Sequence, residues 1–235
     1  MKTATGMNME VMDTAESVAQ RAAAIIAEEA RLAVESRRRF IMAVSGGHTP
    51  WVMLGELAKT DVPWQAVQIV QVDERVAPSG DPDRNLTHLH ESLLNHAPIS
   101  TRQIYPMPVE SADLQAAAAA YAKTLQEVAG IPPVLDLVHL GLGPDGHTAS
   151  LVPGDPVLAI EDSDVAITGV YQGRRRMTLT YPIINRARRV LWVVTGKEKT
   201  PALRKLLDGD ASIPAGRVRR EGALVIADQE AAEER

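Results

Sequence analysis

Apolar and polar positions along the chain follow two periods, one typical of amphipathic helices and one typical of buried strands. Apolar residues recur at helical spacing after Asp13-Thr14-Ala15-Glu16, which looks like a capping box and predicts the first helix. Short apolar runs bounded by turn residues predict strands over 40–44, 67–72, 104–107, 134–140, 165–170, 177–180, 190–195 and 223–227. Further helices are predicted over 51–59, 85–95, 112–128 and 201–207.

Strands that alternate with helices predict a mostly parallel, doubly wound α/β sheet with helices on both faces. The chain has 235 residues, which is enough for one domain of ~100–250 residues with a substantial core. Neither an internal repeat nor a linker divides it. We therefore expect a single domain over 1–235, with 1–12 and 229–235 as flexible ends.

Composition narrows the class of partner. Aromatic residues make up only 3% of the chain, so Ala, Val, Leu and Ile must build the core. The net charge of -5 favours neither a nucleic-acid nor a membrane partner, so any anion site must be a local pocket. The absence of cysteine excludes disulfides, thiolate catalysis and cysteine-ligated zinc. With no signal-peptide pattern over 1–13 and no apolar run near ~20 residues, we expect a cytoplasmic protein.

The loop Ser45-Gly46-Gly47-His48-Thr49-Pro50 joins a predicted strand to a predicted helix, with Thr49 as the expected N-cap. Glycines let the backbone approach a ligand closely, and a helix N-terminus suits a phosphate. A tight, well-capped turn explains the same residues equally well. The loop is neither a Walker loop nor Gly-x-Gly-x-x-Gly, so nucleotide binding is not indicated.

Charged residues follow several predicted strands. In Asp73-Glu74-Arg75, Asp73 or Arg75 is placed to reach a crevice at the sheet edge, although a solvated surface turn has the same pattern. Basic residues over 174–176 and 196–199 are placed to meet a phosphate or to remain in solvent. His88 and His90 lie two apart on a predicted helix and point to different sides, which is poor metal-ligand geometry.

The run Gly141-Leu142-Gly143-Pro144-Asp145-Gly146-His147-Thr148-Ala149-Ser150 sets a titratable pair in a turn after a strand. His147 is the best candidate for a general base, and Asp145 can hold one ring nitrogen. Ser150 raises the possibility of a serine triad. We disfavour it because the chain has no Gly-x-Ser-x-Gly elbow. A capped turn with a surface histidine is the simpler alternative.

Taken in order, these segments resemble those of the 6-phosphogluconolactonases, and the resemblance covers roughly 14–232; the matching segments are 45–50, 73–75, 141–150, 176–180, 196–199, 214–218 and 224–228. The resemblance implies a Rossmann-like fold shared with sugar-phosphate deaminases and isomerases. It also implies hydrolysis of 6-phospho-D-glucono-1,5-lactone to 6-phospho-D-gluconate in the oxidative pentose phosphate pathway. No metal or organic cofactor is implied.

The resemblance also implies roles for particular residues. His147 matches the catalytic histidine and Asp145 its partner, and Asp73 and Arg75 match the charged pair at the mouth of the site. From the chemistry of the reaction, Arg75 and the N–H groups of 143–146 are the candidate donors to the oxyanion. The positions implied for substrate binding are Gly46, Gly47, Thr49, Asp73, Arg176 and Lys199. His48 replaces the usual serine, and Asn85 is kept within an altered Ser-Asn pair; the roles of both stay open.

Two alternatives remain at this point. One is a deaminase or isomerase of the sister family, which carries a glutamate five residues after the histidine, where this chain has Val152. That family also has an aromatic residue at the position where this chain has Arg75. A non-catalytic sugar-phosphate sensor would lose the acid/base pair, which this chain retains. The expected partner is a small sugar-phosphate lactone, and the oligomeric state, a monomer or a weak dimer, stays open. Whether loop 78–84 closes on substrate is also open.

Overall fold

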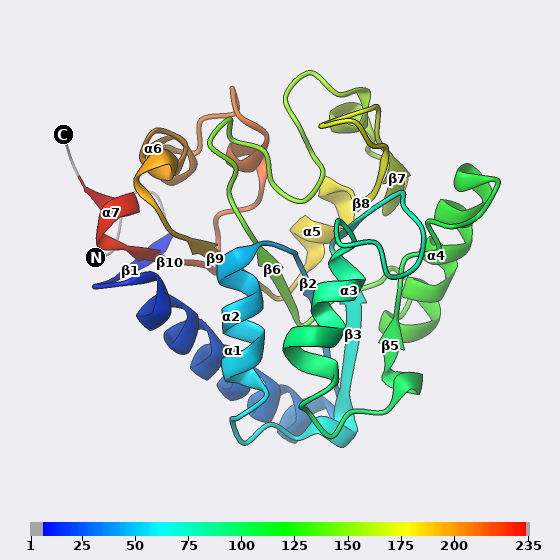
Figure 1. The fold of residues 1–235 in the computed structure, drawn as a ribbon, viewed down its shortest axis with the longest axis horizontal. Coiled ribbons are helices and arrows are strands. Elements are labelled where there is room, and N and C mark those ends of the chain that lie inside the picture. The colour runs from blue at the N-terminus through cyan, green and yellow to red at the C-terminus, as the bar shows by residue number, and fades with distance from the viewer. Residues whose placement is uncertain (1–6, 234–235) are drawn as a thin grey trace.

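The structure, a computed structural model, describes residues 7–233. Its centre is a seven-stranded sheet in which every pair of neighbouring strands is parallel (Figure 1). The strand order is β1-β10-β9-β6-β2-β3-β5. These strands are β1 (Asn8–Met12), β2 (Phe40–Val44), β3 (Val67–Gln71), β5 (Ile104–Tyr105), β6 (Leu137–Leu140), β9 (Arg189–Val194) and β10 (Ala223–Asp228). The predicted fold class is confirmed.

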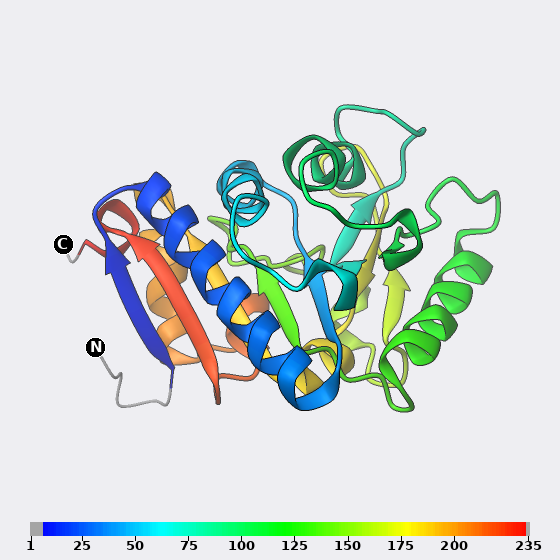
Figure 2. The ribbon, with the colours of Figure 1, turned by 90° about the horizontal axis from the view of Figure 1, so that it is seen from below.

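Helices cover both faces of this sheet, as Figure 2 shows from below. On one face lie α1 (Ala15–Arg37), α2 (His48–Leu57) and α3 (Asn85–Leu89), the last continued by a π-helical turn over His90–Leu94. On the other lie α4 (Leu114–Ala129), α5 (Tyr181–Arg186) and α6 (Thr200–Asp208), and α7 (Gln229–Ala232) follows β10. Within residues 7–233, none of these helices combines the length and the apolar character needed to cross a membrane.

The central strands are apolar on both sides because both sides are covered. In β2, Phe40, Met42 and Val44 pack with α1–α3, whereas Ile41 and Ala43 pack with the α4–α6 layer. All five are buried. This two-sided burial explains why the strands read as unbroken apolar runs rather than as alternating ones.

The order of the strands reverses between β2 and β6. After β2 the chain builds β3 and then β5 on one side, and it then crosses to place β6 on the other side of β2. In doubly wound sheets, ligands bind beyond the carboxyl ends of the strands at such a switch point. The loops that follow β2 and β6 are therefore brought together there.

A small antiparallel sheet, ordered β4-β8-β7, accompanies the main one. It consists of β4 (Asp73–Arg75), β8 (Arg176–Leu179) and β7 (Val165–Ile167). Its register places Arg75 opposite Arg176 and Asp73 opposite Thr178. Charged residues that are distant in sequence thus become neighbours.

The ends of the chain differ from the prediction. Residues 8–12, expected in a flexible end, form β1 and pair with β10, and residues 229–232 form α7. A strand whose partner lies at the other end of the chain leaves little local signal. Helix α1 is capped by Thr14, which forms a reciprocal capping box with Ser17 rather than the one expected from Asp13 to Glu16.

Candidate active site

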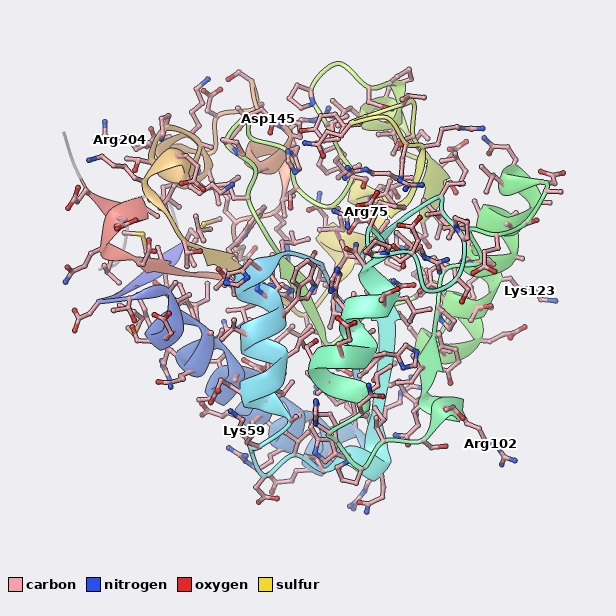
Figure 3. The ribbon with its side chains drawn as sticks, viewed as in Figure 1. Lys59, Arg75, Arg102, Lys123, Asp145 and Arg204 are labelled. Carbon is pink, nitrogen blue, oxygen red and sulfur yellow. The ribbon has the colours of Figure 1, made fainter. Side chains whose placement is uncertain are left out.

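A cavity of about 350 Å³ opens beyond the carboxyl ends of β2, β6 and β9, at the switch point. Every residue expected at the site lines it except Asp145, which lies against His147; the lining ones are Gly46, Gly47, Thr49, Asp73, Arg75, His147, Arg176 and Lys199. Figure 3 shows Arg75 and Asp145 in the upper part of the molecule, whereas Lys59 and Arg102 lie at the opposite end. The fold therefore gathers the expected residues at one edge.

The loop after β2 turns into α2 earlier than predicted. The N-cap is Gly47, with a φ of 127°, so the predicted capping role of Thr49 is wrong. The Thr49 hydroxyl instead shares a 2.7 Å hydrogen bond with the Thr195 hydroxyl. A Cβ on Gly46 would lie 1.9 Å from Oδ1 of Asn85, so only glycine fits there. The loop thus lies closely against Asn85, and the free N–H groups of α2 begin at the cavity.

Asp145 and His147 form a tight pair in the turn after β6. One Asp145 oxygen, Oδ1, lies 2.5 Å from Nδ1 of His147 and accepts the His147 backbone N–H at 3.1 Å. The side chains are 38% and 22% exposed, respectively. A Cβ on Gly143 would lie 2.1 Å from that Nδ1, so the pair rests directly on a glycine. The hydrogen bond that the sequence led us to expect between Asp145 and His147 is therefore present.

The protonation of the pair follows from the pKa of Asp145. Burial raises that pKa, but the hydrogen bond from the His147 backbone, the ring of His147 and the Tyr171 hydroxyl together lower it. An ionised carboxylate can only accept hydrogen bonds, so Nδ1 of His147 must donate. In the neutral ring, Nε2 is then the basic nitrogen.

Ser150 belongs to a different contact. Its Oγ is fully buried and donates to Oδ2 of Asp73 at 2.6 Å. Residues 148–151 form a short turn closed by a bridge between Thr148 and Leu151. Ser150 therefore holds the cavity wall, in agreement with our rejection of a serine triad.

Asn85 connects the charged strand end to the first loop. Its Nδ2 donates to the backbone oxygen of Asp73 at 3.0 Å and to Oδ1 of Asp73 at 3.2 Å. Its Oδ1 accepts from Nη1 of Arg75 at 2.8 Å, and the same Nη1 donates to the backbone oxygen of Asp83 at 2.7 Å. The side chain whose role the sequence left open thus orients both Asp73 and Arg75.

Glu74 is a residue that the sequence analysis passed over. It is 0% exposed and accepts the backbone N–H groups of Arg75, Asn85 and Leu86, each at 2.8 Å. Arg84 lies 3.1 Å from it. Glu74 therefore anchors the start of α3 beneath the cavity. The charged triplet at this strand end was the signal, but the pattern does not say which of its members is buried.

Arg176 is 5% exposed and stands beside Arg75 across β4 and β8. Burial lowers the pKa of Arg176, while the nearby Asp73 carboxylate opposes that change. Among residues 7–233, Nε of Arg75 and Nε of Arg176 have no hydrogen-bond partner although both are buried. Two adjacent guanidinium groups with unused donors are an arrangement suited to an anionic ligand.

Lys199 contributes a third cation from the turn after β9. Its Nζ lies 3.6 Å from the carboxylate of Glu198. The turn is held by Asp228, which accepts the Gly196 N–H at 3.0 Å and caps α7. Three cations, Arg75, Arg176 and Lys199, thus line the cavity together with two carboxylates, Asp73 and Glu198.

Tyr171, which no motif singled out, meets the pair from the hairpin between β7 and β8. Its hydroxyl donates to Oδ2 of Asp145 at 3.3 Å, and its ring makes an edge contact with that of His147 at 5.5 Å. The guanidinium carbon of Arg176 lies 4.9 Å from the ring centroid. The only sequence signal is an aromatic residue close to the basic run 174–176.

Within the described part of the chain, no group of three or more His, Asp or Glu side chains is placed to hold a metal ion. Val152 is 5% exposed and carries no titratable group. The cavity therefore presents one histidine–aspartate pair, three cations, two further carboxylates and the N-terminus of α2.

Comparison with known proteins identifies a family and several relatives to which the chain is similar. The family model described as glucosamine-6-phosphate isomerases/6-phosphogluconolactonase matches residues 13–226. The chain is 34% identical over 233 residues to the 6-phosphogluconolactonase of Synechocystis sp., covering 96% of this chain and 97% of that protein. It is similar to the structure of 6-phosphogluconolactonase from Trypanosoma cruzi, with a TM-score of 0.88, 25% identity and 99% and 98% coverage.

A monomeric glucosamine-6-phosphate deaminase has the same fold, with a TM-score of 0.83 at 21% identity, covering 96% of this chain and 99% of that one. One fold therefore serves two chemistries. The side chains in the cavity must distinguish between them.

Proposed function

The chain belongs to the family of glucosamine-6-phosphate isomerases and 6-phosphogluconolactonases, and we propose that it hydrolyses 6-phospho-D-glucono-1,5-lactone to 6-phospho-D-gluconate in the oxidative pentose phosphate pathway. Relatives 31–34% identical over nearly the whole chain are named 6-phosphogluconolactonase. The observation that carries the proposal is that a single cavity contains His147, held by Asp145, together with Arg75, Arg176 and Lys199.

Substrate binding rests on the cationic side of the cavity. Arg176 and Lys199 hold the phosphate dianion, and the N–H groups that follow Gly46 and Gly47 at the start of α2 add neutral donors. Asp73 and Thr49 also line the cavity, and we assign them to the sugar hydroxyls. Binding the phosphate, which is remote from the reacting carbon, positions the lactone carbonyl beside His147.

Hydrolysis begins with water held at Nε2 of His147. This nitrogen takes a proton from the water as its oxygen attacks C1 of the lactone, and Asp145 stabilises the imidazolium that forms. The bond between C1 and the ring oxygen then breaks. The departing ring oxygen takes the proton from His147, and the new carboxylic acid releases its own proton to solvent. The hydroxyl group of the water has thereby been added to C1 and its proton to the former ring oxygen.

The oxyanion on C1 needs a hydrogen-bond donor. In the turn after β6, the Gly143 N–H donates to the His147 backbone oxygen at 2.8 Å, and the Gly146 N–H donates to the Gly143 oxygen at 2.9 Å. Both are therefore occupied, so that of this turn only the Asp145 N–H stays a candidate beside Arg75. Arg75 remains the better candidate, because its Nε has no hydrogen-bond partner within residues 7–233 and because Asn85 holds the guanidinium in place.

Val152 disfavours the deaminase or isomerase alternative. Opening a sugar ring and moving a proton between carbons requires a further acid/base group, which in the sister family is a glutamate at this place. Valine cannot transfer a proton. Retention of both His147 and Asp145 likewise disfavours a non-catalytic sensor.

The test is an assay of the purified protein on freshly generated 6-phosphogluconolactone, corrected for spontaneous hydrolysis, with glucosamine 6-phosphate in parallel. We expect lactone hydrolysis alone. His147→Ala should lower kcat by ~10²–10⁴ and supplies the control for contaminating lactonases. Activity on glucosamine 6-phosphate without lactone hydrolysis would overturn the proposal.

We place the reaction in the cytoplasm and take the partner to be the small sugar-phosphate lactone rather than a nucleic acid. The absence of cysteine is compatible with a reducing compartment, and the net charge of -5 opposes nucleic-acid binding. We propose a monomer or a weak dimer. Cell fractionation and sedimentation over a range of concentrations test these statements.

A further inference from the structure

The hairpin that joins β7 and β8 ends in a tight turn at the cavity. Tyr171 and Arg174 pair across this turn, with backbone hydrogen bonds of 2.9 and 3.3 Å. Between them, Gln172 and Gly173 have φ values of 51° and 79°, the pattern of a two-residue hairpin turn. Tyr171 is therefore carried by a well-defined turn.

Arg174 anchors this hairpin tip to the loop 78–84. Its Nε donates to Oδ2 of Asp83 at 2.8 Å, and its Nη2 donates to Oδ2 of Asp81 at 3.2 Å. The tip is thereby tied to the same loop whose Asp83 backbone oxygen accepts a hydrogen bond from Arg75. These contacts hold the hairpin tip, and with it Tyr171, against the loop 78–84.

On one side, Tyr171 completes the hydrogen bonding of Asp145. Oδ1 of Asp145 is occupied by the ring and the backbone N–H of His147, and Oδ2 accepts from the Tyr171 hydroxyl. The carboxylate plane cannot rotate without losing one of these bonds. Burial and the Asp145 charge raise the pKa of Tyr171, so the hydroxyl remains a donor at neutral pH.

On the other side, the ring of Tyr171 supports Arg176. The guanidinium carbon lies 4.9 Å from the ring centroid, within the range of a cation–π contact, and Nη2 donates to the neighbouring Gln172 at 3.1 Å. The ring also meets the edge of His147. Tyr171 thus contacts the proposed base His147, the carboxylate of Asp145 that orients it, and Arg176, which we propose binds the phosphate.

We propose that Tyr171 is a positioning residue with two separable functions: its hydroxyl orients Asp145, and its ring orients Arg176. The inference rests on the proposed lactonase function and adds a residue to it. Loss of the hydroxyl should therefore affect the chemical step, whereas loss of the ring should also weaken recognition of the phosphate.

Tyr171→Phe removes only the hydroxyl. We expect kcat to fall ~2–10-fold, the worth of one hydrogen bond, with KM unchanged. Because the hydroxyl acts through Asp145, the same change in an Asp145→Asn background should cost nothing further. Tyr105→Phe is the matched control, since that hydroxyl donates to Gln68 at 3.0 Å outside the cavity. It should leave kcat at the wild-type value.

Tyr171→Leu removes the ring as well. We expect an added ~2–5-fold rise in KM for the phosphorylated lactone, the worth of an exposed cation–π contact, and no such rise for the lactone without phosphate. Calorimetric titration with 6-phosphogluconate should show the same weakening without turnover. Thermal unfolding of each variant establishes that it is folded.

For each function of Tyr171, two results would overturn the inference while leaving the lactonase function intact. The result for the hydroxyl is a wild-type kcat in Tyr171→Phe, or an equal loss in the Asp145→Asn background. The result for the ring is an unchanged KM in folded Tyr171→Leu, or a KM change that is the same for both lactones. Absence of lactonase activity in the wild-type protein would instead refute the proposed function itself.

Discussion

Replacing Gly143 by alanine would place a methyl group in the space that the proposed acid/base pair occupies. The added Cβ would lie 2.1 Å from Nδ1 of His147, 2.2 Å from Cε1 of His147 and 2.7 Å from Oδ1 of Asp145. Ordinary contact requires ~3.5 Å, so the imidazole must move by about 1.4 Å. A displacement of ~1 Å in a reacting group costs ~10²-fold in rate.

We therefore expect Gly143→Ala to lower kcat by ~10²-fold in the lactone assay, with a much smaller change in KM. The groups proposed to hold phosphate lie on β8, α2 and the turn after β9, and the methyl group does not reach them. The backbone of Gly143 lies outside the positive-φ region, and both displaced side chains are partly exposed. Thermal unfolding should therefore shift by only ~2–4 °C.

Gly55→Ala is the control, because Gly55 lies within helix α2 and its Cβ would make only an ordinary 3.7 Å contact with the backbone oxygen of Ser92. It should retain full kcat. Adding Gly143→Ala to His147→Ala should cost nothing more, because the displaced base is already gone. A folded Gly143→Ala enzyme with near-normal kcat, or an equal loss in the His147→Ala background, would refute the reasoning.

Three further outcomes are expected. Arg176→Ala should chiefly raise KM for the phosphorylated lactone and change little for the unphosphorylated one; equal losses on both would separate Arg176 from the phosphate. Because the pKa of Asp145 is lowered in the folded protein, its contacts stabilise the fold above about pH 4 and lose that effect as pH falls through the lowered value. Asp145→Asn should therefore reduce the fall in thermal stability on acidification, and parallel Tm–pH curves would contradict this. Glu74→Gln should lower the free energy of unfolding by about 3–5 kcal/mol in urea titrations, since Arg84 stays buried. Glu91→Gln, whose side chain is 65% exposed, should change it by less than about 1 kcal/mol, and similar losses in the two variants would count against a buried ion pair at Glu74.

The order of elements was predictable because each carries a local signal. The apolar runs became strands because two helical layers cover them, and the helical periodicity of α1 and α4 matches their buried faces. The exact residues at which helices begin and end were harder to predict. Thr49 has the chemistry of an N-cap, but its hydroxyl bonds to Thr195, which directly follows β9, and Gly47 caps the helix instead.

The candidate site was predictable in part for the same reason. Parallel strands bring their carboxyl ends to one edge, so residues that follow different strands, such as Gly46, Asp73 and His147, were expected to meet. Glu74 and Tyr171 were not expected, because their importance comes from partners far along the chain. Nothing in a single sequence indicates that Tyr171 lies against Asp145, or that Asn85 lies against Gly46.

The sequence alone determined the fold class, the acid/base turn and the set of charged residues at the strand ends, since each depends on short-range periodicity and chemistry. The tertiary structure decided which charges are buried, which share a hydrogen bond and which retain unused donors. Register and chain crossing set those relations: β4 and β8 place Arg75 beside Arg176, and the strand reversal brings the loops after β2 and β6 to one cavity. Long-range pairing of this kind has no counterpart in local sequence, because it depends on how the whole sheet is assembled.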